Sequence, residues 1–191
     1  MLDESKFLNP QEIRELRRSL CDRSKSGKKR AVTRWLIVDL GLQTGLRASE
    51  MCDLLIEDIH IAYGQNSIYV KNGKGGKSAN IIINESFKKH LKRYLKWLGN
   101  DSGPLLVTER GGKYSRQALH SIVKGIFKAH KLPERYNVHS LRHSFCSELY
   151  RNTQNLRLVQ MQARHSNVQT TTIYANLLDE EVAQGMKGLY S

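Results

Sequence analysis

The chain has 191 residues, of which 39% are hydrophobic, so it can bury a core and lacks the composition of a disordered polymer. Lysine and arginine number 31 against 18 acidic residues, which gives a formal net charge of +13. So large an excess predicts a polyanionic partner, most simply a nucleic acid, although a basic protein without such a partner would have the same composition.

Cysteine usage and the lack of long apolar segments bear on where the protein works. Cys21, Cys52 and Cys146 lie far apart and form no C-x-x-C pair, so neither a disulfide framework nor a structural zinc site is indicated. A reducing setting is the simplest interpretation. Residues 1–6 are polar, unlike a signal peptide, and no apolar run is long enough to span a bilayer. We therefore expect a cytoplasmic protein with no membrane association.

Two helices are predicted in the first quarter of the chain. The first opens at Asn9, which can cap it, and Glu12 completes a capping box. Residues 22–30 are basic and rich in glycine and serine, which predicts a loop. A strongly apolar helix is expected over residues 31–43, with Gly45 as its stop. Its apolar character predicts that this helix runs through the middle of the domain.

A small sheet and further helices are predicted in the rest of the chain. Residues 57–62, 67–71 and 79–83 have the pattern of short strands separated by glycine-containing turns. Apolar residues at helical spacing then predict helices between Phe87 and Leu98, between Leu119 and Phe127, and over residues 139–150, 156–163 and 170–178. The predicted fold is mainly α, of the α+β class, with a three-stranded antiparallel sheet at one edge.

An ordered set of motifs carries the chemistry. The set comprises residues 44–50 (TGLRASE), the turn 73–75 (GKG), residues 139–143 (HSLRH), and then His165 and Tyr174. Together they supply two arginines, histidines, a lysine and a late tyrosine. These are the groups needed to attack a phosphodiester with a tyrosine hydroxyl, because the reaction needs a nucleophile, proton transfer and cations for the phosphoryl oxygens.

This set resembles the catalytic domain of the tyrosine recombinases, also called the phage integrase family, over about residues 9–178. The resemblance implies that Arg47 and Arg142 hold the scissile phosphate. Arginine suits that role because its planar fork matches two phosphate oxygens and stays charged. Arg47 directly follows the predicted apolar helix and its glycine stop, which weighs against an ordinary surface arginine. Glu50, three residues on, could orient Arg47; the alternative is a solvent-exposed glutamate.

The resemblance implies roles for four more residues. Lys74 would donate a proton to the leaving 5′-hydroxyl, although Lys77 is a near competitor and a solvated hairpin lysine is the alternative. His139 would accept the tyrosine proton, and His165 would hydrogen-bond the phosphoryl group. Tyr174, nine residues after His165, would be the nucleophile and form a 3′-phosphotyrosyl link; the alternative is a packing tyrosine. A tyrosine hydroxyl needs such help because its ordinary pKa is about 10.

His143 raises the alternative of a metal site. It lies four residues after His139 on the predicted helix, a spacing that suits a pair of metal ligands. The sequence offers no third ligand at a suitable spacing and no acidic cluster of the kind that metal-dependent nucleases use. We therefore expect no metal and no cofactor, and interpret His143 as a structural hydrogen-bond donor beside the site.

Two positions depart from the family pattern. Arg164 stands where the family usually has glycine, which tolerates a backbone conformation that other residues disfavour. Arg164 therefore either strains that turn or adds a phosphate contact. Val138 stands where many members have a proline before the histidine, which is a milder change.

The domain organisation is expected to be simple. Residues 1–191 would form a single catalytic domain, without the N-terminal core-binding domain that most members of the family carry. Residues 179–191 would form a C-terminal tail. The resemblance implies that such a tail docks on a neighbouring subunit; the alternative is a helix that folds back on its own domain.

The leading hypothesis is a site-specific DNA recombinase of the integrase, resolvase or invertase type. The resemblance implies that it cleaves and rejoins double-stranded DNA as a homotetramer, in the cytoplasm or nucleoid of a bacterial, phage or mobile-element host. Two alternatives stay open: a DNA relaxer resembling type IB topoisomerases, and a non-catalytic DNA-binding regulator on a recombinase scaffold.

Overall fold

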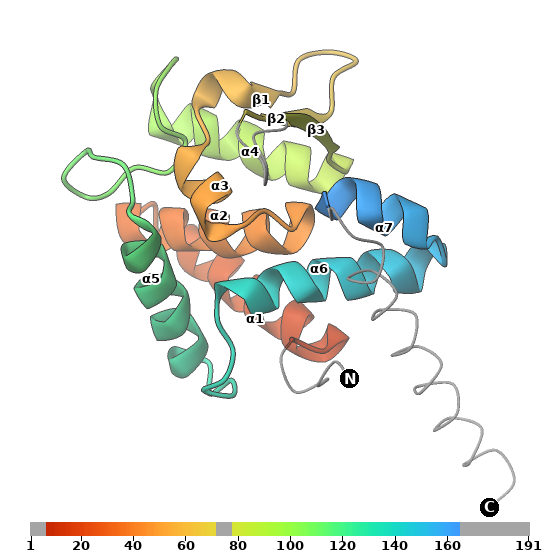
Figure 1. Ribbon diagram of the computed structural model, residues 1–191. Helices are drawn as coiled ribbons and strands as arrows, with labels where there is room; N and C mark the ends of the chain where they lie inside the picture. Colours follow the sequence, from red (N-terminus) through yellow and green to blue (C-terminus); the bar gives the residue numbers. More distant parts are fainter. Residues whose placement is uncertain (1–6, 72–77, 165–191) are drawn as a thin grey trace, which may run out of the picture.

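The structure is a computed structural model that describes residues 7–71 and 78–164 (Figure 1). Its helices in these ranges are α1 (Pro10–Ser24), α2 (Lys29–Thr44), α3 (Ala48–Asp53), α4 (Glu85–Leu98), α5 (Arg116–Ala129), α6 (Val138–Thr153) and α7 (Leu156–Ala163). The strands are β1 (Ile59–His60), β2 (Ser67–Val70) and β3 (Ala79–Ile82). The mainly helical fold with a small sheet at one edge is confirmed. No helix in the described ranges has the length and apolar character needed to cross a membrane.

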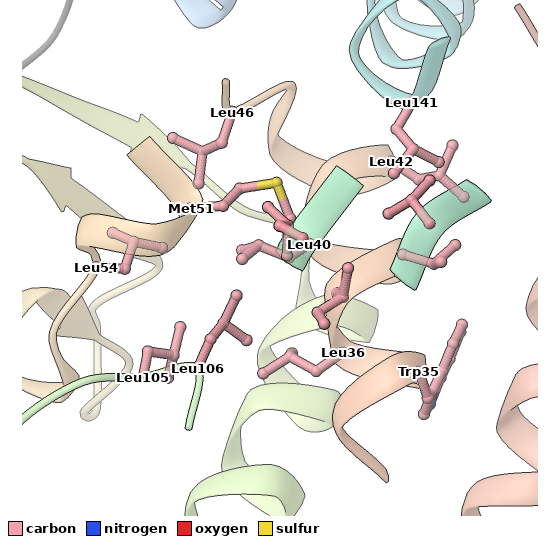
Figure 2. Packing of buried hydrophobic residues seen from close by; sticks show 14 of the residues in the cluster. Trp35, Leu36, Leu40, Leu42, Leu46, Met51, Leu54, Leu105, Leu106 and Leu141 are labelled. Atoms are coloured by element: carbon pink, nitrogen blue, oxygen red, sulfur yellow. The ribbon is translucent and has the colours of Figure 1, made fainter. Parts of the chain in front are cut away.

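Helix α2 forms the centre of the domain. It contacts α1, α3, α4, α5 and α6, which surround it in Figure 1. Leu36, Ile37, Val38 and Leu40 of α2 are completely buried. Figure 2 shows Leu36 and Leu40 among side chains from α3 and from the segment that holds Leu105 and Leu106. The prediction of a central apolar helix is therefore confirmed, and burial of these side chains is the main source of its stability.

The helix ends follow local chemistry. The Asn9 side chain accepts the Glu12 backbone N–H at 2.9 Å, and the Glu12 carboxylate accepts the Asn9 N–H at 2.8 Å, so the predicted capping box is present. Gly45 ends α2 with a left-handed φ of 60°. The predicted loop over residues 22–30 was too long, because α1 continues to Ser24 and α2 already begins at Lys29. Lysine and arginine are favourable helix residues, so a basic composition does not by itself mark a loop.

The sheet is antiparallel in the order β1-β2-β3, as predicted. Ile68 on the middle strand pairs with Ile59 on one side and Ile81 on the other, and all three are buried. The first strand is shorter than the predicted residues 57–62. Residues 56–58 instead form a 3₁₀ turn, in which the Asp58 carboxylate accepts the Leu55 N–H at 3.0 Å.

Gly41 on α2 and Gly45, which caps it, set how closely α6 crosses α2. A Cβ added to Gly41 would lie 2.8 Å from Leu141 Cδ1, and one added to Gly45 would overlap the Phe145 ring. Only a residue without a side chain allows the two backbones this close. The crossing brings the first turns of α6 beside the end of α2, where the TGLRASE motif begins.

A buried polar network joins α1, α2 and α4. The Asp39 carboxylate, 1% exposed, accepts from Arg17 Nε at 2.8 Å and lies 2.6 Å from His90 Nδ1. The His90 ring also stacks on Trp35, with ring centroids 4.6 Å apart. A buried carboxylate requires such partners, because unpaired burial of its charge is costly. Sequence reasoning did not single out these residues.

Candidate active site

Arg47 lies at the junction of α2 and α3 and is held by Glu50. The Arg47 backbone N–H donates to Glu50 Oε2 at 2.8 Å, and its Nη1 donates to Glu50 Oε1 at 2.7 Å. Glu50 is 4% exposed, whereas the Arg47 side chain is 23% exposed. The pairing expected from the three-residue spacing is therefore present, and the glutamate is buried rather than solvent-exposed.

Arg142 lies on α6 and is 6% exposed. Its Nη1 donates to the Gly45 carbonyl at 2.5 Å, and its Nη2 donates to the Ala163 carbonyl at 2.5 Å. These carbonyls lie at the C-terminal ends of α2 and α7, where the helix dipoles favour a cation. Burial is the main reason that the pKa of Arg142 lies below its ordinary value. A guanidinium nevertheless stays protonated, so Arg142 is a buried positive charge.

Arg164 closes α7 in the left-handed conformation, with φ at 56°. Its Nη2 donates to Glu50 Oε2 at 2.5 Å, and its side chain is 10% exposed. Of the two outcomes considered for this residue, the disfavoured backbone conformation is therefore present. The ion pair with Glu50 is a contact that sequence reasoning missed.

Arg47 and Arg164 both bind the carboxylate of Glu50, and Arg142 is held beside them by the Gly45 and Ala163 carbonyls. Arg47 and Arg164 lower the pKa of Arg142 further, whereas Glu50 opposes that shift. Burial is again the largest cause of the lowered pKa of Arg164, and Glu50 counters it. Two guanidinium groups thus share one carboxylate, and a third guanidinium, that of Arg142, interacts with them electrostatically. An anion such as a phosphate would relieve the remaining excess of positive charge.

His139 lies in the first turn of α6, close to His120 on α5. The two imidazole ring centroids are 5.9 Å apart, and the rings are tilted by 56°. Partial burial, followed by His120, Arg142 and Arg47, lowers the pKa of His139. The lowered pKa favours the uncharged imidazole, which is the form that can accept a proton. Sequence reasoning missed His120, because its helix offered only an apolar repeat and no sign of which face meets α6.

The remaining predicted site residues divide into two groups. His143 is half-buried on α6, one turn after His139. No group of three His, Cys, Asp or Glu side chains that could hold a metal ion occurs within residues 7–71 and 78–164. Lys74, His165 and Tyr174 lie outside the described residues.

Comparison with known proteins identifies the family to which this chain belongs. A family model described as the Phage integrase family matches residues 6–181, a range that includes every residue predicted for the site. The chain belongs to the phage integrase family. Membership of this family confirms the resemblance inferred from the ordered motifs.

Several members of the family are similar to most of this chain. Tyrosine recombinase XerD of Oceanobacillus iheyensis is 29% identical over 160 residues, which are 80% of this chain and 53% of the relative. Tyrosine recombinase XerC of Lactobacillus delbrueckii subsp. bulgaricus is 32% identical over 178 residues, which are 90% of this chain and 58% of the relative. The chain thus spans a little more than half the length of these relatives.

Solved structures agree with the fold. The crystal structure of XerA recombinase matches with a TM-score of 0.76 and 26% identity, covering 94% of this chain and 65% of the other. The XerH site-specific recombinase bound to palindromic difH substrate, in a post-cleavage complex, matches with a TM-score of 0.80 and 25% identity. That match covers 99% of this chain and 54% of the XerH chain.

Proposed function

We propose that this chain is the catalytic domain of a tyrosine-type site-specific DNA recombinase. The observation that carries the proposal is the Arg47–Glu50 pair with Arg142 anchored on the Gly45 carbonyl and His139 on the same helix, in a chain of the phage integrase family. Two fixed guanidinium groups suit the stabilisation of a phosphoryl group, and the lowered pKa of His139 suits a proton acceptor.

In the proposed reaction, the phenolic oxygen of Tyr174 attacks the phosphorus of a DNA phosphodiester. His139 takes the phenolic proton, and the bond from phosphorus to the 5′-oxygen breaks. Lys74 gives a proton to that leaving oxygen, while Arg47, Arg142 and His165 bind the phosphoryl oxygens. The product is a 3′-phosphotyrosyl link with a free 5′-hydroxyl. Because the link retains an activated phosphate, a 5′-hydroxyl can reverse the step and rejoin the strand without ATP.

Double-stranded DNA is the proposed partner. The net charge of +13 favours a polyanion, and the similar XerH recombinase was crystallised with its difH substrate. Binding through phosphates should weaken steeply as salt is raised, because counterions are released on association. We propose, as the family resemblance implies, that a homotetramer assembles on the DNA and acts in the cytoplasm or nucleoid.

A covalent-trapping assay tests the proposal. End-labelled duplexes from around the gene, nicked near candidate sites, would be incubated with wild type or Tyr174→Phe at low salt and run on a denaturing gel. We expect a labelled protein–DNA band with wild type only, and severe loss of it in Arg47→Ala and Arg142→Ala.

Other outcomes would redirect the assignment. Undiminished attachment by Tyr174→Phe would contradict the nucleophile. Tight sequence-specific binding without any covalent product would indicate a DNA-binding regulator. Relaxed circles without exchanged strands would indicate a topoisomerase-like activity. Near wild-type cleavage by both arginine variants would show that the phosphate is held elsewhere.

A further inference from the structure

Arg164 occupies a position that is unfavourable in two ways. Its φ of 56° lies in the left-handed region, which costs energy for any residue with a Cβ. Its side chain is also withdrawn from solvent, and the buried Nε has no hydrogen-bond partner within the described part of the chain. Burial of a guanidinium is costly unless its charge is compensated. A short helix can end without a residue at left-handed φ and without a buried guanidinium.

Glu50 supplies the compensation, and it does so with the oxygen that already serves Arg47. Glu50 Oε2 accepts both the Arg47 backbone N–H and Arg164 Nη2, while Glu50 Oε1 accepts Arg47 Nη1. Glu50 is therefore fixed from two sides, from α3 and from the end of α7. A carboxylate held in this way has little freedom to rotate, and its partner Arg47 is confined with it.

The second cation also changes the charge that Arg47 presents. With Arg47 alone, the carboxylate would neutralise the guanidinium that is proposed to bind phosphate. With Arg164 on the same carboxylate, two cations share one negative charge, and Arg142 adds a third cation close by. Unlike a surface pair, this cluster is weakly screened by solvent, so an incoming phosphate would feel its net charge strongly.

We propose that Arg164 is a positioning residue for DNA cleavage, which fixes Glu50 and thereby orients Arg47 while leaving the cluster positively charged toward the scissile phosphate. This role rests on the proposed function of the chain. Arg164 acts through Glu50 and Arg47, and the experiment below separates this role from simple closure of α7.

The test compares two glycine variants with the same backbone and charge change. Arg164→Gly removes a cation from the cluster and relieves a φ of 56°. Lys131→Gly removes an exposed cation and relieves a φ of 56° just after the far end of α5, away from His120. The two variants share their net charge and their relief of backbone strain, so a difference between them reports loss of the buried Arg164 guanidinium with its contacts to Glu50 and the Gln162 carbonyl. Circular dichroism would establish that both are folded.

Single-turnover formation of the covalent complex would be measured on a nicked duplex, with DNA affinity measured separately. We expect Arg164→Gly to slow attachment roughly tenfold or more with nearly unchanged affinity, because a preorganised cation is lost at the step where charge is stabilised. Lys131→Gly should match wild type. Arg164→Lys should recover part of the rate, because it restores the charge without the planar fork.

A duplex with a methylphosphonate at the scissile position gives a second readout. This group has one fewer negative charge, so cleavage depends less on the positive charge of the cluster. The deficit of Arg164→Gly relative to Lys131→Gly should therefore shrink on this substrate. An equal deficit on both substrates would overturn the electrostatic role of Arg164.

The outcomes distinguish this inference from the proposed function. Equal attachment rates for wild type, Arg164→Gly and Lys131→Gly would overturn the role of Arg164 and leave the recombinase assignment intact. If wild type forms no Tyr174-dependent covalent complex on any duplex that it binds, the proposed function fails, and the role of Arg164 fails with it.

Discussion

The close crossing of α2 and α6 predicts a large effect for Gly45→Ala. A Cβ at φ 60° costs about 1–2 kcal/mol. The same Cβ would overlap the Phe145 ring, and overpacking of a core adds roughly 1–3 kcal/mol. We therefore expect the free energy of unfolding to fall by roughly 2–5 kcal/mol, the sum of these two costs. Urea unfolding followed by tryptophan fluorescence and circular dichroism would measure it.

Gly99→Ala is the matched control for this prediction. Gly99 ends α4 as Gly45 ends α2, with a φ of 70° and its N–H donated four residues back, but a Cβ there would meet nothing within 4 Å. Its loss should be only the backbone cost of about 1–2 kcal/mol. Phe145→Ala in the Gly45→Ala background should then cost less than Phe145→Ala alone, because it removes the overlap.

Two results would refute this reasoning. Equal losses for Gly45→Ala and Gly99→Ala would show that α6 yields freely and that the crossing is not tightly constrained. Additive effects of Gly45→Ala and Phe145→Ala would show that the ring is not the obstacle. The prediction also concerns the site, because the Gly45 carbonyl accepts Arg142 Nη1. A displaced α6 would therefore move Arg142, and covalent attachment should fall in Gly45→Ala but not in Gly99→Ala.

Three further outcomes are expected. Asp39→Asn should lower the free energy of unfolding by about 3 kcal/mol in urea denaturation, because His90 and Arg17 lose a buried anionic partner; an unchanged midpoint would contradict this. The pKa of His139 is lowered, so its neutral form persists to lower pH, and cleavage should fall only as pH drops through a value below the ordinary 6.5. A profile that falls at or above 6.5 would argue against His139 as proton acceptor. Arg47→Lys should reduce the rate of covalent attachment by a larger factor than the affinity for DNA, because lysine lacks the planar guanidinium fork. Equal losses of rate and affinity would contradict the proposal that this fork orients the phosphate.

The fold was predictable where its signals are local. The capping box at Asn9, the glycine stop at Gly45 and the three short strands each depend on a few adjacent residues, and each is present. The predicted element boundaries were wrong in two places. In one, a side chain bonded to the backbone; in the other, the helix propensity of individual residues outweighed the loop-like composition of the segment. Asp58 accepts a backbone N–H and converts the start of the first predicted strand into a turn. Arg23, from the predicted loop, lies in the last turn of α1, and Lys29 and Arg30 begin α2.

The same distinction applies to the site. The pairing of Arg47 with Glu50 spans three residues, so their spacing was enough to predict it. Arg142 reaches a carbonyl 97 residues away, and Arg164 reaches a carboxylate 114 residues away. Those contacts depend on how helices cross, which periodicity does not specify. His120 went unnoticed for the same reason, because its importance arises only from the approach of α5 to α6.

The acceptors of Arg142 explain why stability and chemistry are hard to separate in this domain. A buried guanidinium needs acceptors, and here they are the carbonyls that end α2 and α7. Removing Arg142 would leave those carbonyls without their partner and would also remove a cation from the site. Loss of cleavage in Arg142→Ala would therefore be ambiguous by itself. Glycine substitutions at site residues with positive φ reduce this ambiguity. They relieve backbone strain, and a more favourable backbone conformation cannot by itself account for a slower reaction. Arg164→Gly is such a change, and its comparison with Lys131→Gly separates the loss of the buried guanidinium and its contacts from the changes in backbone strain and net charge.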